Sequence, residues 1–479
     1  MAADASAPFR EAADALVAGM RQSRIPGAAL GILAHGREEH ATFGQASLAS
    51  ARPVTPATLF QIASITKTYT ATAIWRLIDQ GALTPDAPVR RYLPDLRLSD
   101  EATAAEVTVA NLLEHTAGWF SDEVFDDGDD DGALARFVEQ RLPRQPQLFR
   151  CGEFFSYSNS AFQLLGRLIE VVTGETFQTA ARHLLFDPIG ARDTMLDRSA
   201  VLGRPYADGH TAMPVNGQDA VLVQTPVWLP RCVDPAGGIW STTRDVLRYA
   251  RIHLADPPVG VPALVRPESL QAMQEPAAAI PGLGLHMGRS WFVEEVDGLR
   301  VISHNGDTSG QHAVLLMVPE LRFAFAVLLN GQPGAVAALA ALDAALSAYP
   351  GLAALSGRVG LMRSLLAPAD ADVISLTGDQ LQGYAGRYVD PGQTTTFRIV
   401  GETLEKTSQL TPAPGAWRPA FAPPPAEPIA VTFTEPDLAV AGGVRIPFVR
   451  RPDGSVGWLA EGLRLRPRCD DDAGRQPDA

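Results

Sequence analysis

Lysine is almost absent from this chain. Lys67 and Lys406 are the only two lysines among 479 residues, which include 38 arginines. A lysine can release its proton when desolvation lowers its pKa, whereas an arginine effectively cannot. A position that keeps lysine in such a background is therefore a candidate for chemistry that arginine cannot perform.

Cysteine is also scarce. The chain has Cys151, Cys232 and Cys469, which lie far apart in the sequence. Three scattered cysteines predict neither a disulfide framework nor a zinc site, and no histidine spacing marks any of them as a catalytic thiol.

Long apolar runs and an excess of positive charge are missing as well. No apolar run reaches the roughly 18–20 residues that span a bilayer. The first twenty residues lack the basic and apolar regions of a secretory signal, so we expect a cytoplasmic protein that does not engage a membrane. The formal charge of −14 argues against nucleic acid as a partner. Part of this charge lies in Ser121–Gly132, which lacks calcium-loop spacing and predicts a solvated acidic loop.

The order of the predicted elements indicates one sheet built from both ends of a first domain. Helical spacing covers Phe9–Gln22, and a hairpin of Gly27–Leu33 and His40–Gly44 follows. Mostly helical patterns then fill the middle of the chain, so we expect a helical subdomain beside the sheet. The later elements are three strands and a closing helix: Arg300–Ser303, Ala313–Val318, Phe323–Leu329 and Ala335–Ser347.

The C-terminal part has the pattern of a small β domain. Short strands at Thr395–Val400, Ala430–Phe433 and Ser455–Leu459 are separated by proline and glycine. We expect Leu381–Tyr388 to be the first strand of this domain. The predicted organisation is a catalytic domain over 8–350, a linker over 351–370, a β-barrel over 371–468 and a disordered tail over 469–479.

Lys67 follows Ser64 by three residues at the start of a predicted helix, Ile62–Gln80. Residues at i and i+3 share one helix face. A serine hydroxyl is a weak nucleophile until a base takes its proton, and Lys67 could be that base. The four-residue pattern is weak alone. Lys406 has no serine at that offset, and we expect it to be an exposed lysine at a strand end.

Two further elements strengthen the pattern, although each has a structural alternative. Tyr157-Ser158-Asn159 precedes a predicted helix, Ala161–Thr173. Ser158 or Asn159 could cap that helix, or Tyr157 could move a proton while Asn159 holds a substrate carbonyl. His304-Asn305-Gly306 follows a strand-like run. It could be a simple turn, or Gly306 could let a substrate approach the backbone closely.

In order and spacing, these three elements resemble those of the penicillin-binding and class C β-lactamase-like serine hydrolases. That family includes D-aminopeptidases, esterases and penicillin-binding-type thioesterases. Supporting resemblances are Leu112–Gly118 and Pro235–Ser241, and the match covers Pro8–Tyr349. It implies an α/β (α+β) fold with an antiparallel sheet flanked by helices and a helical subdomain. The C-terminal domain resembles the antiparallel lipocalin-like barrels found in several such proteins.

The resemblance also implies roles for particular residues. Ser64 would attack a carbonyl while Lys67 and Tyr157 handle its proton; which of the two accepts that proton stays open. Asn159 would position Lys67 and the acyl amide, and backbone N–H groups of Ser64 and Asp307 would form the oxyanion hole. His304 would replace a lysine of the family pattern and carry a pH-dependent charge. Substrate-binding positions would also include Gly237, Gly238, Gly306 and Trp119, whereas His115 is expected to be structural.

Several functions remain open at this stage. The chain could hydrolyse or transfer amide or ester acyl groups of small-molecule or peptide substrates, with weak β-lactamase activity ranked lower. It could be a thioesterase that releases and cyclises a nonribosomal peptide held on a carrier protein. It could also bind such ligands without turnover. The resemblance implies neither a metal nor an organic cofactor, and the oligomeric state is left open.

Overall fold

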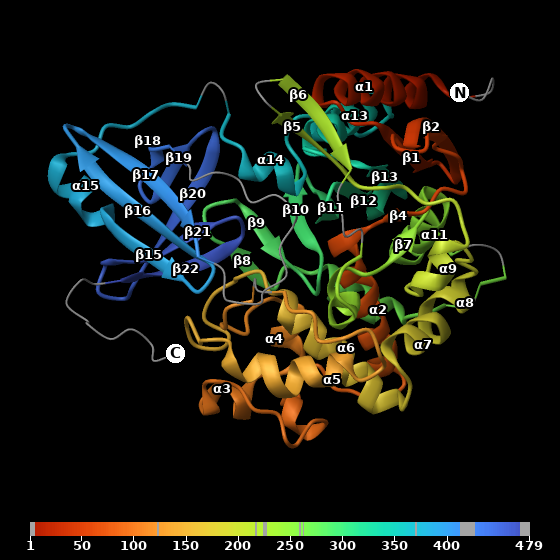
Figure 1. The fold of residues 1–479 in the computed structure, drawn as a ribbon, viewed down its shortest axis with the longest axis horizontal. Helices are drawn as coiled ribbons and strands as arrows, with labels where there is room; N and C mark the ends of the chain where they lie inside the picture. The colour runs from red at the N-terminus through yellow and green to blue at the C-terminus, as the bar shows by residue number, and fades with distance from the viewer. Residues whose placement is uncertain are drawn as a thin grey trace.

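A computed structural model of the chain describes residues 5–121, 124–215, 218–223, 228–257, 260–261, 263–368, 371–411 and 427–469. Figure 1 shows a large sheet-and-helix body with a smaller barrel beside it, drawn in blue. Among the described residues, no helix is both long and apolar enough to cross a membrane.

One nine-stranded antiparallel sheet forms the centre of the large body. Its order is β3-β2-β1-β13-β12-β11-β10-β9-β8, so strands from both ends of the domain meet where β1 pairs with β13. This confirms the predicted sheet, but the short strands β8, β9 and β10 were not predicted from the sequence. The bounds are β1 Gly27–Ala34, β2 Arg37–Ser47, β3 Arg52–Pro53, β8 Ala278–Ile280, β9 Leu285–Met287, β10 Phe292–Val296, β11 Leu299–Thr308, β12 Gln311–Val318 and β13 Phe323–Leu329.

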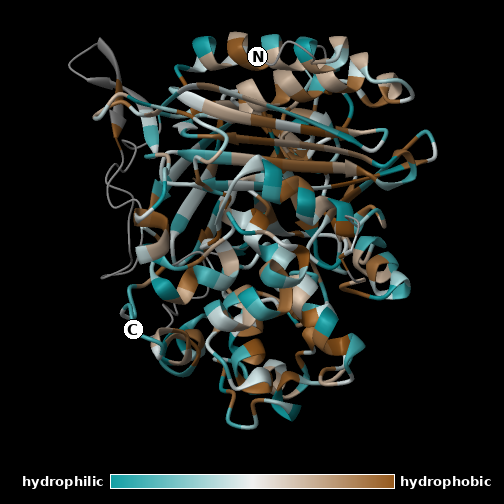
Figure 2. Ribbon diagram, turned by 90° about the vertical axis from the view of Figure 1, so that its right-hand side faces the viewer, coloured by the Kyte–Doolittle hydropathy of each residue, from teal (hydrophilic) through white to brown (hydrophobic). Residues whose placement is uncertain are grey.

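Helices cover both faces of this sheet, which explains why β1, β12 and β13 are buried along their whole length. On one face lie α1 (Ala7–Ser23) and α13 (Ala335–Ala348), seen above the sheet in Figure 2. The helical subdomain lies on the other face. The helices between β3 and β8 in the chain are α2 Thr66–Asp79, α3 Glu101–Glu106, α4 Val109–Leu113, α5 Ala133–Arg136, α6 Asn159–Thr173, α7 Phe177–Ala181, α8 Asp187–Ile189, α9 Arg198–Leu202, α10 Asp234–Gly237, α11 Thr243–His253 and α12 Pro267–Gln274.

Small pairings complete the large body. Strand β4 pairs with β7, and the hairpin β5–β6 pairs with β14. The sequence did not predict the β5–β6 hairpin in the middle segment. These bounds are β4 Phe60–Gln61, β5 His210–Val215, β6 Gln218–Val223, β7 Trp240–Ser241 and β14 Gly331–Gln332.

The acidic segment is largely solvated, as expected, and also forms ion pairs. Of Ser121–Gly132, Asp122 and Glu123 lie outside the described residues. Four carboxylates in the rest of the segment pair with four arginines; Asp129, Asp130 and Asp131 stay 65–75% exposed, whereas Asp127 is 6% exposed. The pairs are Asp127–Arg141, Asp129–Arg198, Asp130–Arg136 and Asp131–Arg231.

The C-terminal strands close into an eight-stranded antiparallel barrel, as expected. Each strand pairs with the next along the chain, and β22 returns to pair with β15. The short helix α14 (Leu361–Leu365) lies between the two bodies. The strand bounds are β15 Gly386–Asp390, β16 Gln393–Val400, β17 Thr403–Leu410, β18 Ile429–Glu435, β19 Leu438–Ala441, β20 Val444–Arg450, β21 Val456–Glu461 and β22 Arg464–Cys469.

Two details of the barrel differ from expectation. Leu381–Tyr388 is not one strand, because Thr377 and Gln380 form a capping box that starts helix α15 (Gly378–Tyr384); β15 begins only at Gly386. Lys406 is not exposed at a strand end. It lies within β17 with a side chain 12% exposed and paired to Glu461. The predicted tail from residue 470 onward lies outside the described residues.

Candidate active site

Ser64 lies in a strained turn at the N-terminal end of helix α2. It belongs to a single 3₁₀ turn, Ala63–Ile65, and not to the α-helix, which begins at Thr66. The preceding Ala63 has a φ of +47°, a left-handed conformation that costs free energy for a residue with a side chain. Such strain is common where a fold must present a reactive group.

Strand β11 packs directly on this turn through Gly306. A Cβ atom at Gly306 would lie 2.1 Å from the carbonyl oxygen of Ile62 and 3.1 Å from Cβ of Ala63. The sequence analysis expected Gly306 to admit a substrate. The structure gives it another reason, because glycine lets the strand reach the backbone beside Ser64.

Lys67 lies one turn after Ser64 and is fully buried. Its Nζ donates to Ser64 Oγ over 3.1 Å and to the carbonyl oxygen of Ala236 over 2.7 Å. The same Nζ lies 4.9 Å from the centre of the Tyr157 ring. The predicted i, i+3 pair is thus in hydrogen-bonding contact, with an aromatic ring above the ammonium group.

Tyr157 is held by His115, which the sequence analysis had treated as structural. The two rings stack 4.4 Å apart, and Nδ1 of His115 accepts from the backbone N–H of Ser158 over 2.9 Å. Burial lowers the pKa of His115 well below its usual value, with a further contribution from the charge of Lys67. A neutral imidazole that accepts at Nδ1 carries its hydrogen on Nε2.

The predicted helix cap belongs to Ser158. Its hydroxyl accepts from the N–H of Ala161 at the start of α6, so Asn159 becomes the first residue of that helix. Asn159 then lines the same cavity as Ser64 and Tyr157. The capping role of this motif thus belongs to Ser158, while Tyr157 and Asn159 line the cavity.

His304 faces this group from the sheet. Its ring centre lies 6.2 Å from that of Tyr157, and its Nδ1 donates to the carbonyl oxygen of Asn305 over 2.6 Å. Burial and the charge of Lys67 lower the pKa of His304 to about 3. With its side chain 1% exposed and this lowered pKa, His304 is neutral at neutral pH, and its charge changes only in the acid range.

Asp307 and the glycines of α10 frame Ser64 on its other sides. The Asp307 carboxylate accepts from His312 Nδ1 over 2.7 Å and from Gln332 Nε2 over 2.8 Å. Burial would raise the pKa of Asp307, but His312 and Gln332 together hold it below its usual value. Gly237 and Gly238 follow Ala236, the carbonyl partner of Lys67, and Gly237 lines the cavity.

Gly238 and Trp119 serve the packing around the site. A Cβ atom at Gly238 would lie 2.4 Å from Oδ1 of Asp234, so a glycine is needed to close α10. Trp119 is 3% exposed, and its Nε1 donates to Ser160 Oγ over 2.8 Å inside the helical subdomain. The structure does not place Trp119 along the cavity that Ser64 opens into.

That cavity has a volume of about 760 Å³ and is walled by both bodies of the molecule. Most of the larger lining residues are apolar: Val124, Leu229, Val233, Phe292, Leu361, Met362, Leu365 and Leu463.

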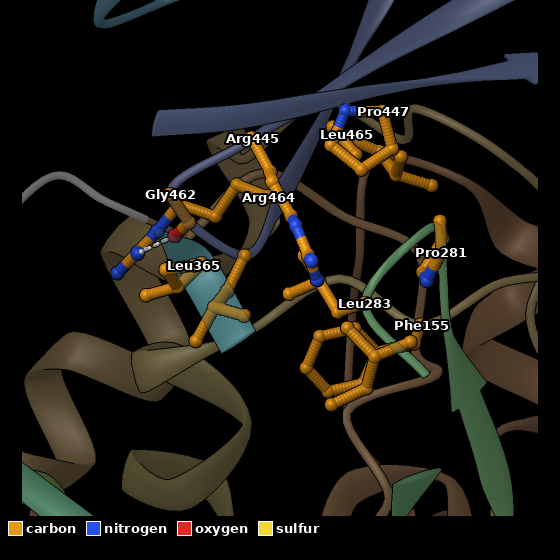
Figure 3. A pocket seen from close by; sticks show the side chains of 12 residues that line it. Phe155, Pro281, Leu283, Leu365, Arg445, Pro447, Gly462, Arg464 and Leu465 are labelled. Atoms are coloured by element: carbon orange, nitrogen blue, oxygen red, sulfur yellow. Dashed lines mark hydrogen bonds between the residues drawn. The ribbon is translucent and has the colours of Figure 1, made fainter. Parts of the chain in front are cut away.

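The barrel contributes through the turn between β21 and β22. The Leu463 carbonyl oxygen accepts from the N–H of Tyr157 over 2.9 Å, and the Arg464 guanidinium lies 5.1 Å above the Tyr157 ring. Figure 3 shows this junction, where Arg464 Nη1 donates to the Gly462 carbonyl oxygen over 2.8 Å. The sequence analysis missed Leu463 and Arg464, since no spacing pattern connects them with Tyr157.

Strand β11 of the central sheet, a helical subdomain and a serine–lysine pair at the start of α2 define the class of β-lactamase-like serine hydrolases. The comparison with known families agrees: residues 12–349 match the family model described as Beta-lactamase, and the chain belongs to that family.

The chain is similar to proteins of differing activity. It is 32% identical to penicillin-binding protein 4 of Amycolatopsis lactamdurans over 338 residues, covering 68% of this chain and 85% of that protein. It is 31% identical to esterase EstB of Burkholderia gladioli, covering 59% of this chain and 86% of that protein.

Two solved structures extend the comparison. A class C β-lactamase from Rhodobacter sphaeroides has a TM-score of 0.57 and 26% identity, covering 70% of this chain and 98% of its own. SurE, in a crystal structure with D-leucine, has a TM-score of 0.72 and 26% identity. That likeness covers 97% of this chain and 100% of SurE, so it includes the barrel.

Proposed function

We propose that this protein forms an acyl-enzyme on Ser64 and cleaves or transfers amide or ester acyl groups of peptide-like substrates. The contact between Lys67 Nζ and Ser64 Oγ, over 3.1 Å, carries this proposal. A serine can attack a carbonyl when a neighbouring group removes its proton. Lys67 contacts Ser64 directly, and Tyr157 lines the same cavity with its ring beside Lys67 Nζ.

In the proposed acylation step, Ser64 Oγ forms a bond to the substrate carbonyl carbon as its proton passes to Lys67 or Tyr157. The tetrahedral oxyanion accepts hydrogen bonds from the backbone N–H groups of Ser64 and Asp307, each worth about 3–4 kcal/mol. The leaving group receives the proton and departs. Water or an amine then attacks the acyl-enzyme, and the same groups move the proton of the incoming nucleophile.

The cavity lining favours a substrate with apolar side chains and a polar backbone. Apolar residues make up much of the lining, whereas Asn159 and Arg464 are polar members of it. Arg464 can bind a carbonyl or carboxylate oxygen of a peptide. We therefore propose peptide-like acyl groups as substrates, with Arg464 as the contact from the barrel.

The test is a panel of acyl donors with wild type and Ser64→Ala. A chromogenic cephalosporin, short-chain p-nitrophenyl esters, D-amino-acid amides and a peptidyl thioester would be followed for turnover. We expect turnover of at least one donor by wild type and none by Ser64→Ala. Absence of turnover and of any covalent adduct on wild type would contradict the proposal. An adduct that never clears would instead indicate a ligand-binding protein.

A second candidate function is a penicillin-binding-type thioesterase that cyclises a nonribosomal peptide. SurE, which is similar to this chain over its whole length, was crystallised with D-leucine, and nonribosomal peptides contain D-residues. In that case the amine of the peptide, rather than water, would attack the acyl group on Ser64. A linear peptidyl thioester with an apolar D-residue at its carboxyl end would yield a cyclic product by mass spectrometry. A linear acid alone would favour the hydrolase.

A further inference from the structure

The barrel gathers four charged side chains inside the end that faces the catalytic cavity. Lys406 on β17 and Arg466 on β22 are positive; Asp390 at the end of β15 and Glu461 at the end of β21 are negative. Their side chains are only 12%, 7%, 3% and 19% exposed, in that order. Strands β17 and β21 are not neighbours, so the Lys406–Glu461 pair crosses the barrel interior.

Glu461 is the centre of this network. It pairs with Lys406 and with Nη1 of Arg466, the latter over 2.9 Å. It also accepts from Gln393 Nε2 over 3.1 Å and from Thr395 Oγ1 over 3.2 Å. Nε of Arg466 lies 2.6 Å from Oδ2 of Asp390. The two positive and two negative charges compensate one another, so removal of Lys406 leaves Asp390 and Glu461 with Arg466 as their one positive partner in this network.

The residue after Glu461 begins the turn that reaches the candidate active site. Gly462 and Leu463 form a two-residue hairpin turn with φ values of +58° and +70°. Such a turn requires left-handed backbone at both positions, which is unfavourable for leucine. The turn therefore needs its flanking strands to be held in place.

The turn and the start of β22 make two contacts with Tyr157 and one with its neighbour Ser156. The Leu463 carbonyl accepts from the Tyr157 N–H, and the Leu465 N–H donates to Ser156 Oγ over 3.1 Å. The Arg464 guanidinium lies over the Tyr157 ring. A shift of the β21–β22 turn would therefore displace Tyr157 and Arg464 together.

We propose that Lys406 and Glu461 are positioning residues for the acyl-transfer site, acting through the Gly462–Arg464 turn and not on the substrate. This inference rests on the proposed function. It also gives the second lysine of the chain a role at the same site as the first, although the two lie in different bodies of the molecule.

A matched control exists at the opposite end of the barrel. There Arg450, at the end of β20, and Asp437 form an ion pair of 2.7 Å beside Tyr384. Strand β20 neighbours β21, but Arg450 pairs with Val456 near the start of β21, at the end away from the β21–β22 turn. A general weakening of the barrel by Lys406→Met would speed hydrogen exchange around Arg450 as well, whereas the proposed role predicts faster exchange only at the turn and at Tyr157.

The first measurement is hydrogen exchange of the full chain, which does not depend on activity. In Lys406→Met, amides of residues 462–465 and the Tyr157 amide should exchange about tenfold faster than in wild type. They should be unchanged in Arg450→Met, and Lys406→Arg should restore protection because it keeps the charge. Unchanged exchange in Lys406→Met would overturn the inference, whether or not the protein forms an acyl-enzyme.

The second measurement is a double-mutant cycle on the acylation rate with a p-nitrophenyl ester. Lys406→Met and Arg464→Ala should each lower this rate about 10- to 100-fold, because small displacements at a reacting centre are costly. The double variant should be no slower than Arg464→Ala, since both changes act through one turn. Additive losses would overturn the inference. Failure of wild type to acylate would contradict only the proposed function, because the exchange experiment stands apart from it.

Discussion

At the scale of single residues, the scarcity of lysine is informative because both lysines make specific buried or half-buried contacts. Lys67 Nζ contacts the hydroxyl of Ser64 and the backbone carbonyl of Ala236. An arginine would bring a broad planar group that keeps its proton. This explains why lysine persists at position 67 in a chain that otherwise uses arginine.

Lys67→Arg should therefore lower the acylation rate by roughly 100- to 10,000-fold, the usual contribution of a positioned proton acceptor. Lys406→Arg is the matched control, because the same substitution there keeps the positive charge that pairs with Glu461. Stopped-flow kinetics with a p-nitrophenyl ester would measure both. Equal rates for Lys67→Arg and wild type would show that Lys67 is not needed as a proton carrier.

His304 gives a pH prediction. Its pKa of about 3 in the folded chain lies below its usual 6.5, so the unfolded chain binds a proton first as the pH falls. The folded state loses stability between about pH 6.5 and 3, by up to about 1.4 kcal/mol per pH unit from this residue. His304→Asn removes this contribution. Between pH 6 and 4.5, the unfolding free energy of wild type should fall about 2 kcal/mol further than that of the variant.

Urea unfolding at these two pH values would measure the difference. Identical pH dependence of the two proteins would show that His304 titrates near its usual value in the folded state. The absolute stability of His304→Asn does not enter the comparison, because only the change with pH is compared.

The site residues differ in how far the sequence could predict them. Ser64, Lys67, Tyr157, Asn159 and His304 come from three short motifs. Four of them line one cavity, and Lys67 lies buried against Ser64. The neutral state of His304 could not be predicted, since it depends on burial by distant segments. Trp119 was placed at the substrate because its motif adjoins the site, yet its indole points into the helical core.

At the scale of elements, the position of Ser64 depends on the fit between β11 and the turn before α2. Gly306 is where the two backbones meet. Gly306→Ala should lower the unfolding free energy by about 1–3 kcal/mol through overpacking and should also greatly reduce turnover.

Gly383→Ala in helix α15 is the control for that substitution. No atom lies within 4 Å of a Cβ added at Gly383, and alanine is the better helix former, so stability should rise by about 0.5–1 kcal/mol. Thermal unfolding and ester turnover of the two variants would test this contrast. A Gly306→Ala protein with wild-type stability and turnover would contradict the close approach of β11.

Element prediction succeeded where the hydrophobic period was clear. β13 has the bounds expected, and α6 begins two residues before the predicted start. It failed for β8–β10 and for β5–β6, whose short strands lie in a segment assigned to helices. It also failed at Leu381–Tyr384, where a capping box outweighs the alternating pattern.

At the scale of the whole molecule, the barrel is part of the catalytic cavity. Its β21–β22 turn lines the cavity and contacts Tyr157, and Gly282 of the catalytic body closely approaches Pro447 of β20. The composition of the C-terminal region indicated a small β domain, but its docking depends on contacts between residues some 300 positions apart.

Arg464→Ala tests this contribution directly. It should lower the rate for peptide-like donors about tenfold or more, since a charge-assisted contact contributes about 1.5–3 kcal/mol. Arg398→Ala, on the exposed side of β16, should leave the rate unchanged. Equal rates for the two variants would mean that the barrel does not take part in substrate binding.

The central claim is that Ser64 becomes covalently acylated, and intact-mass spectrometry tests it most directly. Wild type incubated with a p-nitrophenyl ester and a chromogenic cephalosporin, then quenched in acid, should gain one acyl group. Peptide mapping should place that group on Ser64, and Ser64→Ala should remain unmodified. An unmodified wild type, or an adduct that persists in Ser64→Ala, would contradict the account.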